Sequence, residues 1–114
     1  MPQGINLIVF PVKDLGRAKT LYTSLLGVQP YVDAAYYAGF RLGGQEIGLH
    51  PNGHAEGMSG PVGYWQVDDI EQSLKQLLDA GAQVHQGVKD VGGGKRTAII
   101  KDADGNMIGL LQSP

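Results

Sequence analysis

The 114-residue sequence contains no cysteine, which excludes disulfides, a thiol nucleophile and zinc sites built from thiolates. It also lacks any block of lysine or arginine. Nine basic and eleven acidic residues give a formal net charge of -2, a balance that disfavours nucleic acid binding. No apolar run is long enough to cross a bilayer, and the opening residues lack the features of a secretory signal. We therefore expect a cytoplasmic protein that binds neither nucleic acid nor membrane.

Glycine is the abundant residue. The chain has 18 glycines, more than twice the usual share of about 7%, which indicates many tight turns and close backbone approaches. Hydrophobic residues make up 42% of the chain. A chain of this length can bury one core, so the composition predicts a single globular domain over residues 1–114.

The first half of the chain predicts one strand, one helix and three further strands. The helix is capped by Asp14 and stopped by Gly27, because apolar residues recur between them at 3.6-residue spacing. A glycine pair at residues 43–44 predicts a tight hairpin turn. The four expected strands cover residues 5–10, 30–32, 36–42 and 45–50.

The second half repeats this order of signals. Asp69 caps a helix that Gly81 ends, and Asp104-Gly105 predicts the last hairpin turn. The expected strands cover residues 62–67, 83–89, 96–101 and 106–111.

The two halves also align in sequence. Residues 12–15 align with residues 67–70, and residues 47–49 align with residues 108–110. The chain therefore predicts two tandem βαβββ modules, residues 1–50 and 61–114, joined by a linker over residues 51–60.

This arrangement resembles the vicinal oxygen chelate superfamily, which includes glyoxalase I, extradiol dioxygenases and bleomycin resistance proteins. The resemblance rests on the motifs at residues 12–15, 26–28 and 67–70, and on residues 102–106 before the last strand. It implies an α+β fold in which the two modules form a cupped mixed sheet with the helices on its outer face. Such proteins hold a small molecule in the cup, usually as homodimers, so we expect a homodimer.

Catalytic members of this superfamily hold a divalent metal on four side chains, taken from the first and last strands of each module. The resemblance puts these positions at Leu7, Gly48, Val62 and Gly109. Two aliphatic side chains and two glycines offer no oxygen or nitrogen ligand. We therefore expect no metal site and no other cofactor.

Alternation along the strands predicts which side chains point into the cup. Along residues 62–67, Tyr64 and Gln66 face the cup, whereas Trp65 packs in the core against the helices. Arg96 is expected at the mouth of the cup, where it could meet a carboxylate. The complete set of predicted ligand-binding residues is Leu7, Val9, His50, Val62, Tyr64, Gln66, Arg96, Met107 and Leu111.

Two polar motifs have simple structural explanations. His50, His54 and Glu56 lie close in sequence, but their spacing on a loop favours solvated linker residues over a metal site. His50 alone shares the cup face of its strand, where it could bind a ligand or act as a base. The glycine-rich run at residues 92–97 departs from the phosphate-loop pattern and is interpreted as a hairpin connection.

These features favour a metal-free protein, similar to the bleomycin resistance branch, that holds a small, partly aromatic ligand in an apolar cup. No nucleophile with an adjacent base is visible, so no catalytic residue is assigned. Two alternatives stay open. The first is a glyoxalase-like lyase or isomerase, or a dioxygenase-related enzyme, with an atypical site that works through His50. The second is a dimeric interaction module whose cup is filled by its own side chains.

Overall fold

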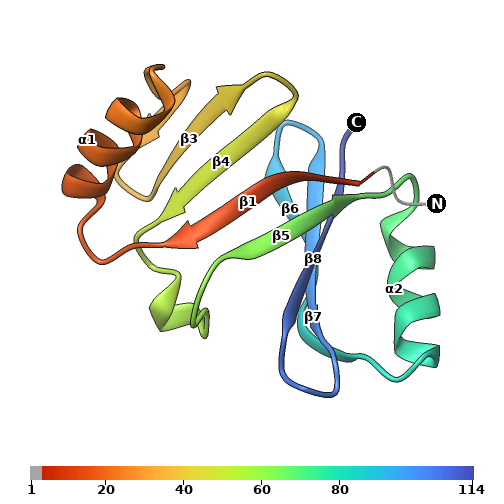
Figure 1. Ribbon diagram of the computed structural model, residues 1–114. Helices are drawn as coiled ribbons and strands as arrows, with labels where there is room; N and C mark the ends of the chain where they lie inside the picture. The colour runs from red at the N-terminus through yellow and green to blue at the C-terminus, as the bar shows by residue number, and fades with distance from the viewer. Residues whose placement is uncertain (1–3) are drawn as a thin grey trace. The chain divides into compact units, whose positions relative to one another are not determined.

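The computed structural model describes residues 4–114, which form two α-helices and eight strands (Figure 1). Two compact units divide the chain. One comprises residues 6–62, and the other comprises residues 63–114 together with residues 4–5. Each unit contains one helix and a mixed four-stranded sheet, so the α+β class expected from the sequence is confirmed.

The unit of residues 6–62 has the element order β-α-β-β-β. Its strands lie in the order β2-β3-β4-β1, with β1 parallel to β4 and the other neighbours antiparallel. The elements are β1 (Ile5–Pro11), α1 (Leu15–Leu26), β2 (Val32–Ala34), β3 (Tyr37–Leu42) and β4 (Gln45–His50).

The unit of residues 63–114 repeats this element order. Its strands lie in the order β5-β8-β7-β6, with β5 parallel to β8 and the other neighbours antiparallel. The elements are β5 (Val62–Gln66), α2 (Ile70–Asp79), β6 (Gln83–Gly92), β7 (Lys95–Lys101) and β8 (Met107–Gln112).

Both helices begin at the aspartates that the sequence indicates. The Asp14 carboxylate accepts a hydrogen bond of 3.0 Å from the backbone N–H of Arg17, and Asp69 accepts one of 3.1 Å from Gln72. Each bond satisfies a backbone donor that the first helical turn leaves free. At the other end of α1, Gly27 adopts the left-handed conformation with φ 73°, which confirms it as the stop residue.

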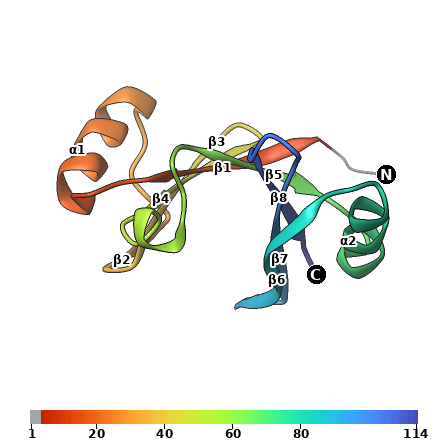
Figure 2. The ribbon, with the colours of Figure 1, turned by 90° about the horizontal axis from the view of Figure 1, so that it is seen from below.

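Each helix covers one face of the sheet in its own unit (Figures 1 and 2). Under α1 the fully buried core is Ala38, Phe40 and Leu49. Under α2 the buried residues that pack together are Val67, Ile70, Ala98 and Leu110. Because successive strand residues point to opposite faces, these two cores fix which side chains face away from the helices.

Three expectations about local structure are corrected. The strand expected over residues 30–32 lies at Val32–Ala34. Strand β6 extends to Gly92 instead of ending at residue 89, because Gly93 and Gly94 both take positive φ angles and form a tight turn that pairs Gly92 with Lys95. Trp65 is 37% exposed and is not a core residue. Its register with Leu110 puts it on the helix side of the sheet, but the main contacts of α2 are with β6, β7 and β8.

The segment after β4 is an ordered turn. Residues His54–Glu56 form a 3-10 helix, and the Met58 side chain is 5% exposed. The backbone N–H of Met58 donates to the Gly53 carbonyl at 2.9 Å. Within residues 4–114, neither helix has the length and apolar character needed to span a membrane.

Candidate functional site

In residues 6–62, the sheet face opposite α1 carries two glycines side by side. Gly39 on β3 and Gly48 on β4 are direct register partners, and they alternate with Ala38 and Leu49, which lie under α1. The glycines therefore face away from the helix and leave two adjacent positions without side chains. We call Gly39 and Gly48 the glycine pair.

The ring of Tyr37 lies across the glycine pair. A Cβ atom built on Gly48 would overlap the Tyr37 hydroxyl oxygen and lie 2.7 Å from Cζ, whereas ordinary contacts begin near 3.4 Å. A Cβ atom built on Gly39 would lie 3.2 Å from Cε2 of Tyr37 and 3.3 Å from Cε1 of Tyr31. The Tyr37 ring thus rests on bare backbone, and the Tyr31 ring meets it above Gly39.

A polar cluster surrounds Tyr31. Its hydroxyl donates a hydrogen bond to the Glu46 carboxylate, and the Arg41 guanidinium lies 4.0 Å from the centre of its ring. Burial and the neighbouring Glu46 carboxylate raise the pKa of Tyr31 above its ordinary value. The phenol therefore stays protonated at neutral pH and serves as the donor to Glu46.

His50 follows on the same face of β4. Its Nε2 lies 3.0 Å from a carboxylate oxygen of Glu56, which stands in the 3-10 helix His54–Glu56. Among the described residues, the His50 Nδ1 atom is buried and has no hydrogen-bond partner. An imidazole held by a carboxylate at Nε2 presents an acceptor at Nδ1, an arrangement suited to ligand binding or proton transfer.

In residues 63–114, a second glycine is covered by a second tyrosine. Tyr64 on β5 and Gly109 on β8 are direct partners on the face opposite α2. A Cβ atom built on Gly109 would lie 2.5 Å from Cδ2 and 2.7 Å from Cγ of Tyr64, whose side chain is buried at 9% exposure. The close contact is with the base of the ring, so this ring is fixed more firmly than that of Tyr37.

The predicted site residues fall into two groups. Four of them are buried hydrophobic residues, with exposed fractions from 1% to 9%: Val9, Val62, Tyr64 and Leu111. The other five are partly buried: Leu7, His50, Gln66, Arg96 and Met107.

Arg96 does not share the face of Tyr64. Its guanidinium forms an ion pair with Glu71 of α2. Its register partner Gln112 accepts a 2.8 Å hydrogen bond from the backbone N–H of Ile70, the first residue of that helix. Arg96 therefore lies on the helix side of the sheet.

Four residues around the glycine pair are absent from the predicted set: Tyr31, Tyr37, Arg41 and Glu46. For Tyr37 a signal existed, because it has the parity of Gly39 along β3 and therefore faces away from α1. Tyr31 lies before β2, where strand alternation says nothing about the direction of its side chain.

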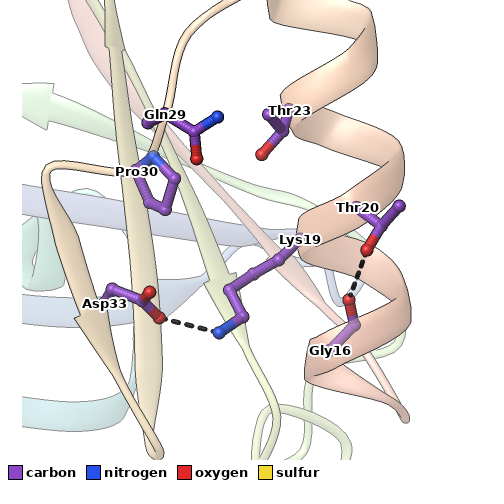
Figure 3. Close-up of a pocket in the computed structure, with 7 residues that line it drawn as sticks. All are labelled: Gly16, Lys19, Thr20, Thr23, Gln29, Pro30 and Asp33. Carbon is purple, nitrogen blue, oxygen red and sulfur yellow. Dashed lines mark hydrogen bonds and ion pairs between the residues drawn. The ribbon is translucent and has the colours of Figure 1, made fainter.

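A separate hollow of about 480 Å³ lies between α1 and β2 (Figure 3). Its charged groups pair with each other, since Lys19 Nζ lies 2.8 Å from the Asp33 carboxylate. The Thr20 hydroxyl donates to the Gly16 carbonyl at 3.2 Å. The hollow is lined by Gly16, Lys19, Thr20, Thr23, Gln29, Pro30 and Asp33.

The residues at the four implied metal positions do not fit a metal ion. Leu7 and Val62 carry only hydrocarbon, and tyrosine rings lie where the side chains of residues 48 and 109 would begin. A divalent ion needs several oxygen or nitrogen donors around it. Across residues 4–114, no group of three or more histidine, aspartate or glutamate side chains could hold one elsewhere.

Comparisons with known proteins agree with this fold. The model of the Glyoxalase/Bleomycin resistance protein/Dioxygenase superfamily matches residues 4–110. A structure described as an NAD-dependent benzaldehyde dehydrogenase from Legionella pneumophila is 22% identical, with TM-score 0.76 and coverage of 96% of this chain and 99% of that one. A superfamily member from Vibrio splendidus 12B01 is 16% identical, with TM-score 0.71 and coverage of 95% and 97%.

Methylmalonyl-CoA epimerase from Mycobacterium tuberculosis is 19% identical, with TM-score 0.74 and coverage of 99% of this chain and 89% of that one. At these identities the likeness shows the fold alone. The comparison with curated proteins gives no match.

Proposed function

The chain belongs to the Glyoxalase/Bleomycin resistance protein/Dioxygenase superfamily, and from this membership we propose that it binds a small, partly aromatic molecule without using a metal ion. One observation carries the proposal. Gly48 and Gly109, where the superfamily resemblance implies metal ligands, are each overlain by a tyrosine ring. Both positions are therefore glycines that accommodate an aromatic ring and supply no metal ligand, which suits an organic ligand.

The chemistry of the helix-free faces supports this proposal. Each face combines buried apolar side chains with a few polar groups, such as the His50 imidazole and the tyrosine hydroxyls. Small-molecule sites have this composition, since apolar walls supply affinity and polar groups fix orientation. Arg96 is not part of the proposed site, because its guanidinium forms an ion pair with Glu71 of α2. The proposed ligand-binding residues are Leu7, Val9, His50, Val62, Tyr64, Gln66, Met107 and Leu111.

The ligand proposal is tested by screening aromatic metabolites and antibiotics by thermal shift, using protein without a histidine tag. We expect at least one compound to stabilise the protein. Its affinity, measured by calorimetry, should fall at least about tenfold in Tyr64→Val, a loss of about 1.4 kcal/mol. Trp65→Ala is the matched control, because it removes the adjacent aromatic residue from the opposite face. Unchanged affinity in both Tyr64→Val and Val62→Asp would refute the site.

The proposal includes a homodimer in the cytoplasm. Strands β2 and β6 each lie at an edge of the sheet of their own unit, and edge strands offer backbone groups that another chain could cover. Light scattering should return about twice the mass of the 12.1 kDa chain. A monomer at micromolar concentration would remove this part of the proposal.

The second candidate function is proton transfer by His50. The pairing of its Nε2 with Glu56, together with the buried acceptor at Nδ1, favours a base in this position. The epimerase among the structural neighbours suggests a substrate to test. Deuterium uptake into methylmalonyl-CoA in D₂O, followed by mass spectrometry, should occur with wild type and disappear in His50→Ala. Equal uptake by both proteins would exclude this role for His50.

A further inference from the structure

The Tyr37 ring covers the glycine pair and occupies the space that two side chains would otherwise fill. One edge of the ring lies over Gly39 and the hydroxyl end lies over Gly48. The ring reaches this depth only because both positions lack a Cβ atom. The bare backbone of β3 and β4 therefore offers a flat surface that fits an aromatic ring at van der Waals distance.

The position of Tyr37 in the fold would let its side chain turn away from the glycine pair while β3 and β4 stay paired. It is the first residue of β3, directly after the turn that follows β2, and its side chain is only partly buried. Its close contact with Gly48 comes from the hydroxyl end, which a rotation about χ1 carries away. The Tyr64 side chain is held more firmly than that of Tyr37. It is buried, and its contact with the Gly109 position is made by the Cγ atom at the base of the ring.

Polar groups flank Gly48 along β4. Glu46, Gly48 and His50 alternate along the same face of this strand, so a carboxylate precedes Gly48 and an imidazole follows it. The Tyr31 ring forms an aromatic wall beside Gly39. The bare backbone of the glycine pair, the Tyr31 ring beside it and the polar groups on either side of Gly48 suit a planar ring with a polar substituent.

We propose that the aromatic ring of the ligand binds over Gly39 and Gly48, a place that we call the seat. In the ligand-free protein the Tyr37 ring occupies the seat. The inference rests on the proposed function and names its ligand class: a phenol or a similar planar ring with one hydrogen-bonding group. Binding displaces the Tyr37 ring, so the measured affinity is reduced by the fraction of molecules in which the seat is filled.

The first test uses 4-methylphenol, which has the shape of a tyrosine side chain, and NMR of the wild-type protein. Without the probe, nuclear Overhauser effects should join the Tyr37 ring protons to the Hα protons of Gly39 and Gly48. At saturating probe these contacts should weaken, and contacts from the probe ring to the same Hα protons should appear. Tyr37 contacts that persist while the probe is bound would overturn the proposal, as would binding with no contact to the glycine pair.

The second test changes the occupancy of the seat. If Tyr37 fills the seat about nine-tenths of the time, Tyr37→Ala should bind 4-methylphenol about tenfold more tightly than wild type. Tyr36→Ala is the matched control, because Tyr36 is the adjacent tyrosine and is 69% exposed. Weaker binding by Tyr37→Ala would overturn the proposal, since Tyr37 would then hold the ligand itself.

The third test adds a side chain at Gly48, where the ligand ring would lie. Gly48→Ala adds a methyl group where the ring must lie and should abolish binding of the probe in both the wild-type and Tyr37→Ala backgrounds. Gly44→Ala is the matched glycine control, because no atom lies within 4 Å of its Cβ position and its φ is not positive. Unchanged binding by Gly48→Ala would overturn the proposal.

The outcomes separate this inference from the proposed function. If the compound found by thermal shift still depends on Tyr64 but 4-methylphenol fails to contact Gly39 and Gly48, only the seat is wrong. If the compound binds equally well to Tyr64→Val and Val62→Asp, the proposed function fails, and the glycine pair is then judged by the NMR contacts alone.

Discussion

Substitution of Gly109 by alanine tests the packing of Tyr64 most directly. At an open position in a strand, alanine is more stable than glycine by roughly 0.5–1 kcal/mol, because glycine loses more conformational entropy on folding. Gly109 is not open. Its added Cβ would lie 2.5 Å from Cδ2 and 2.7 Å from Cγ of a buried ring, and contacts under 3.0 Å require something to move.

The steric cost should exceed the gain in entropy. Overpacking in a well-packed interior costs typically about 1–3 kcal/mol. We therefore expect Gly109→Ala to lower the free energy of unfolding by about 1–2 kcal/mol, against a gain of up to about 1 kcal/mol at an unobstructed site. Gly48→Ala should cost less, because it meets the hydroxyl end of the partly buried Tyr37, which can swing aside.

Urea denaturation at 25 °C measures these changes from the midpoint at constant slope. A double-mutant cycle isolates the contact, with Tyr64→Val removing the ring while keeping a strand-forming residue. In the Tyr64→Val background, Gly109→Ala should become neutral or stabilising, which gives a coupling energy of roughly 2 kcal/mol. The reasoning is refuted if Gly109→Ala stabilises the wild type, or if the two substitutions add without coupling.

Three further outcomes are expected. Asp14→Ala and Asp69→Ala should each lower the free energy of unfolding by about 1 kcal/mol in urea titrations, because each removes a helix cap; no loss in either would contradict the cap assignment. Hydrogen bonds from the Asn106 side chain and backbone hold the pKa of Asp102 below its ordinary value, so Asn106→Ala should raise the midpoint of its carboxyl carbon in NMR pH titrations. Since the folded-state pKa of Asp102 is lowered, its contribution to stability is present above its unfolded pKa and disappears as the pH falls through its folded pKa. Urea midpoints measured over this pH range should fall in wild type and fall less in Asn106→Ala.

The helix ends could be predicted because their causes are local. An aspartate before an apolar periodic segment and a glycine after it determine the hydrogen bonds of the first turn and the backbone angles of the last. Asp14, Gly27 and Asp69 were identified from the sequence for that reason, and the structure has them in these roles. The tight turns follow the same logic, because positive φ angles require glycine.

The faces of the strands were predicted less completely. Alternation assigned Trp65 correctly to the helix side, but it could not reveal that α2 packs mainly over β6, β7 and β8 and that Trp65 stays 37% exposed. For Arg96, alternation with Ala98 pointed to the helix side, and the pairing with Glu71 agrees. The expectation that Arg96 lies at a cup mouth took no account of this alternation.

The covering of the glycines could not be read from the sequence. Strand parity gives the face of Tyr37 but not the direction in which its ring leans, which depends on rotamers and neighbours. Tyr37 reaches Gly48 from β3, whereas Tyr64 reaches Gly109 from β5. The two modules thus cover equivalent glycines from different strands, so the sequence repeat itself did not predict this feature.

Equilibrium metal binding decides whether the glycine and aliphatic positions have lost the metal site. The untagged protein, stripped with EDTA, is dialysed to equilibrium against Ni²⁺, Mn²⁺ or Zn²⁺ and its metal content is measured by mass spectrometry, with His54→Ala as a control for surface binding. We expect clearly substoichiometric metal and no gain in thermal stability, because Leu7, Gly48, Val62 and Gly109 supply no ligands. One ion per chain that stabilises both the wild type and the control would contradict it.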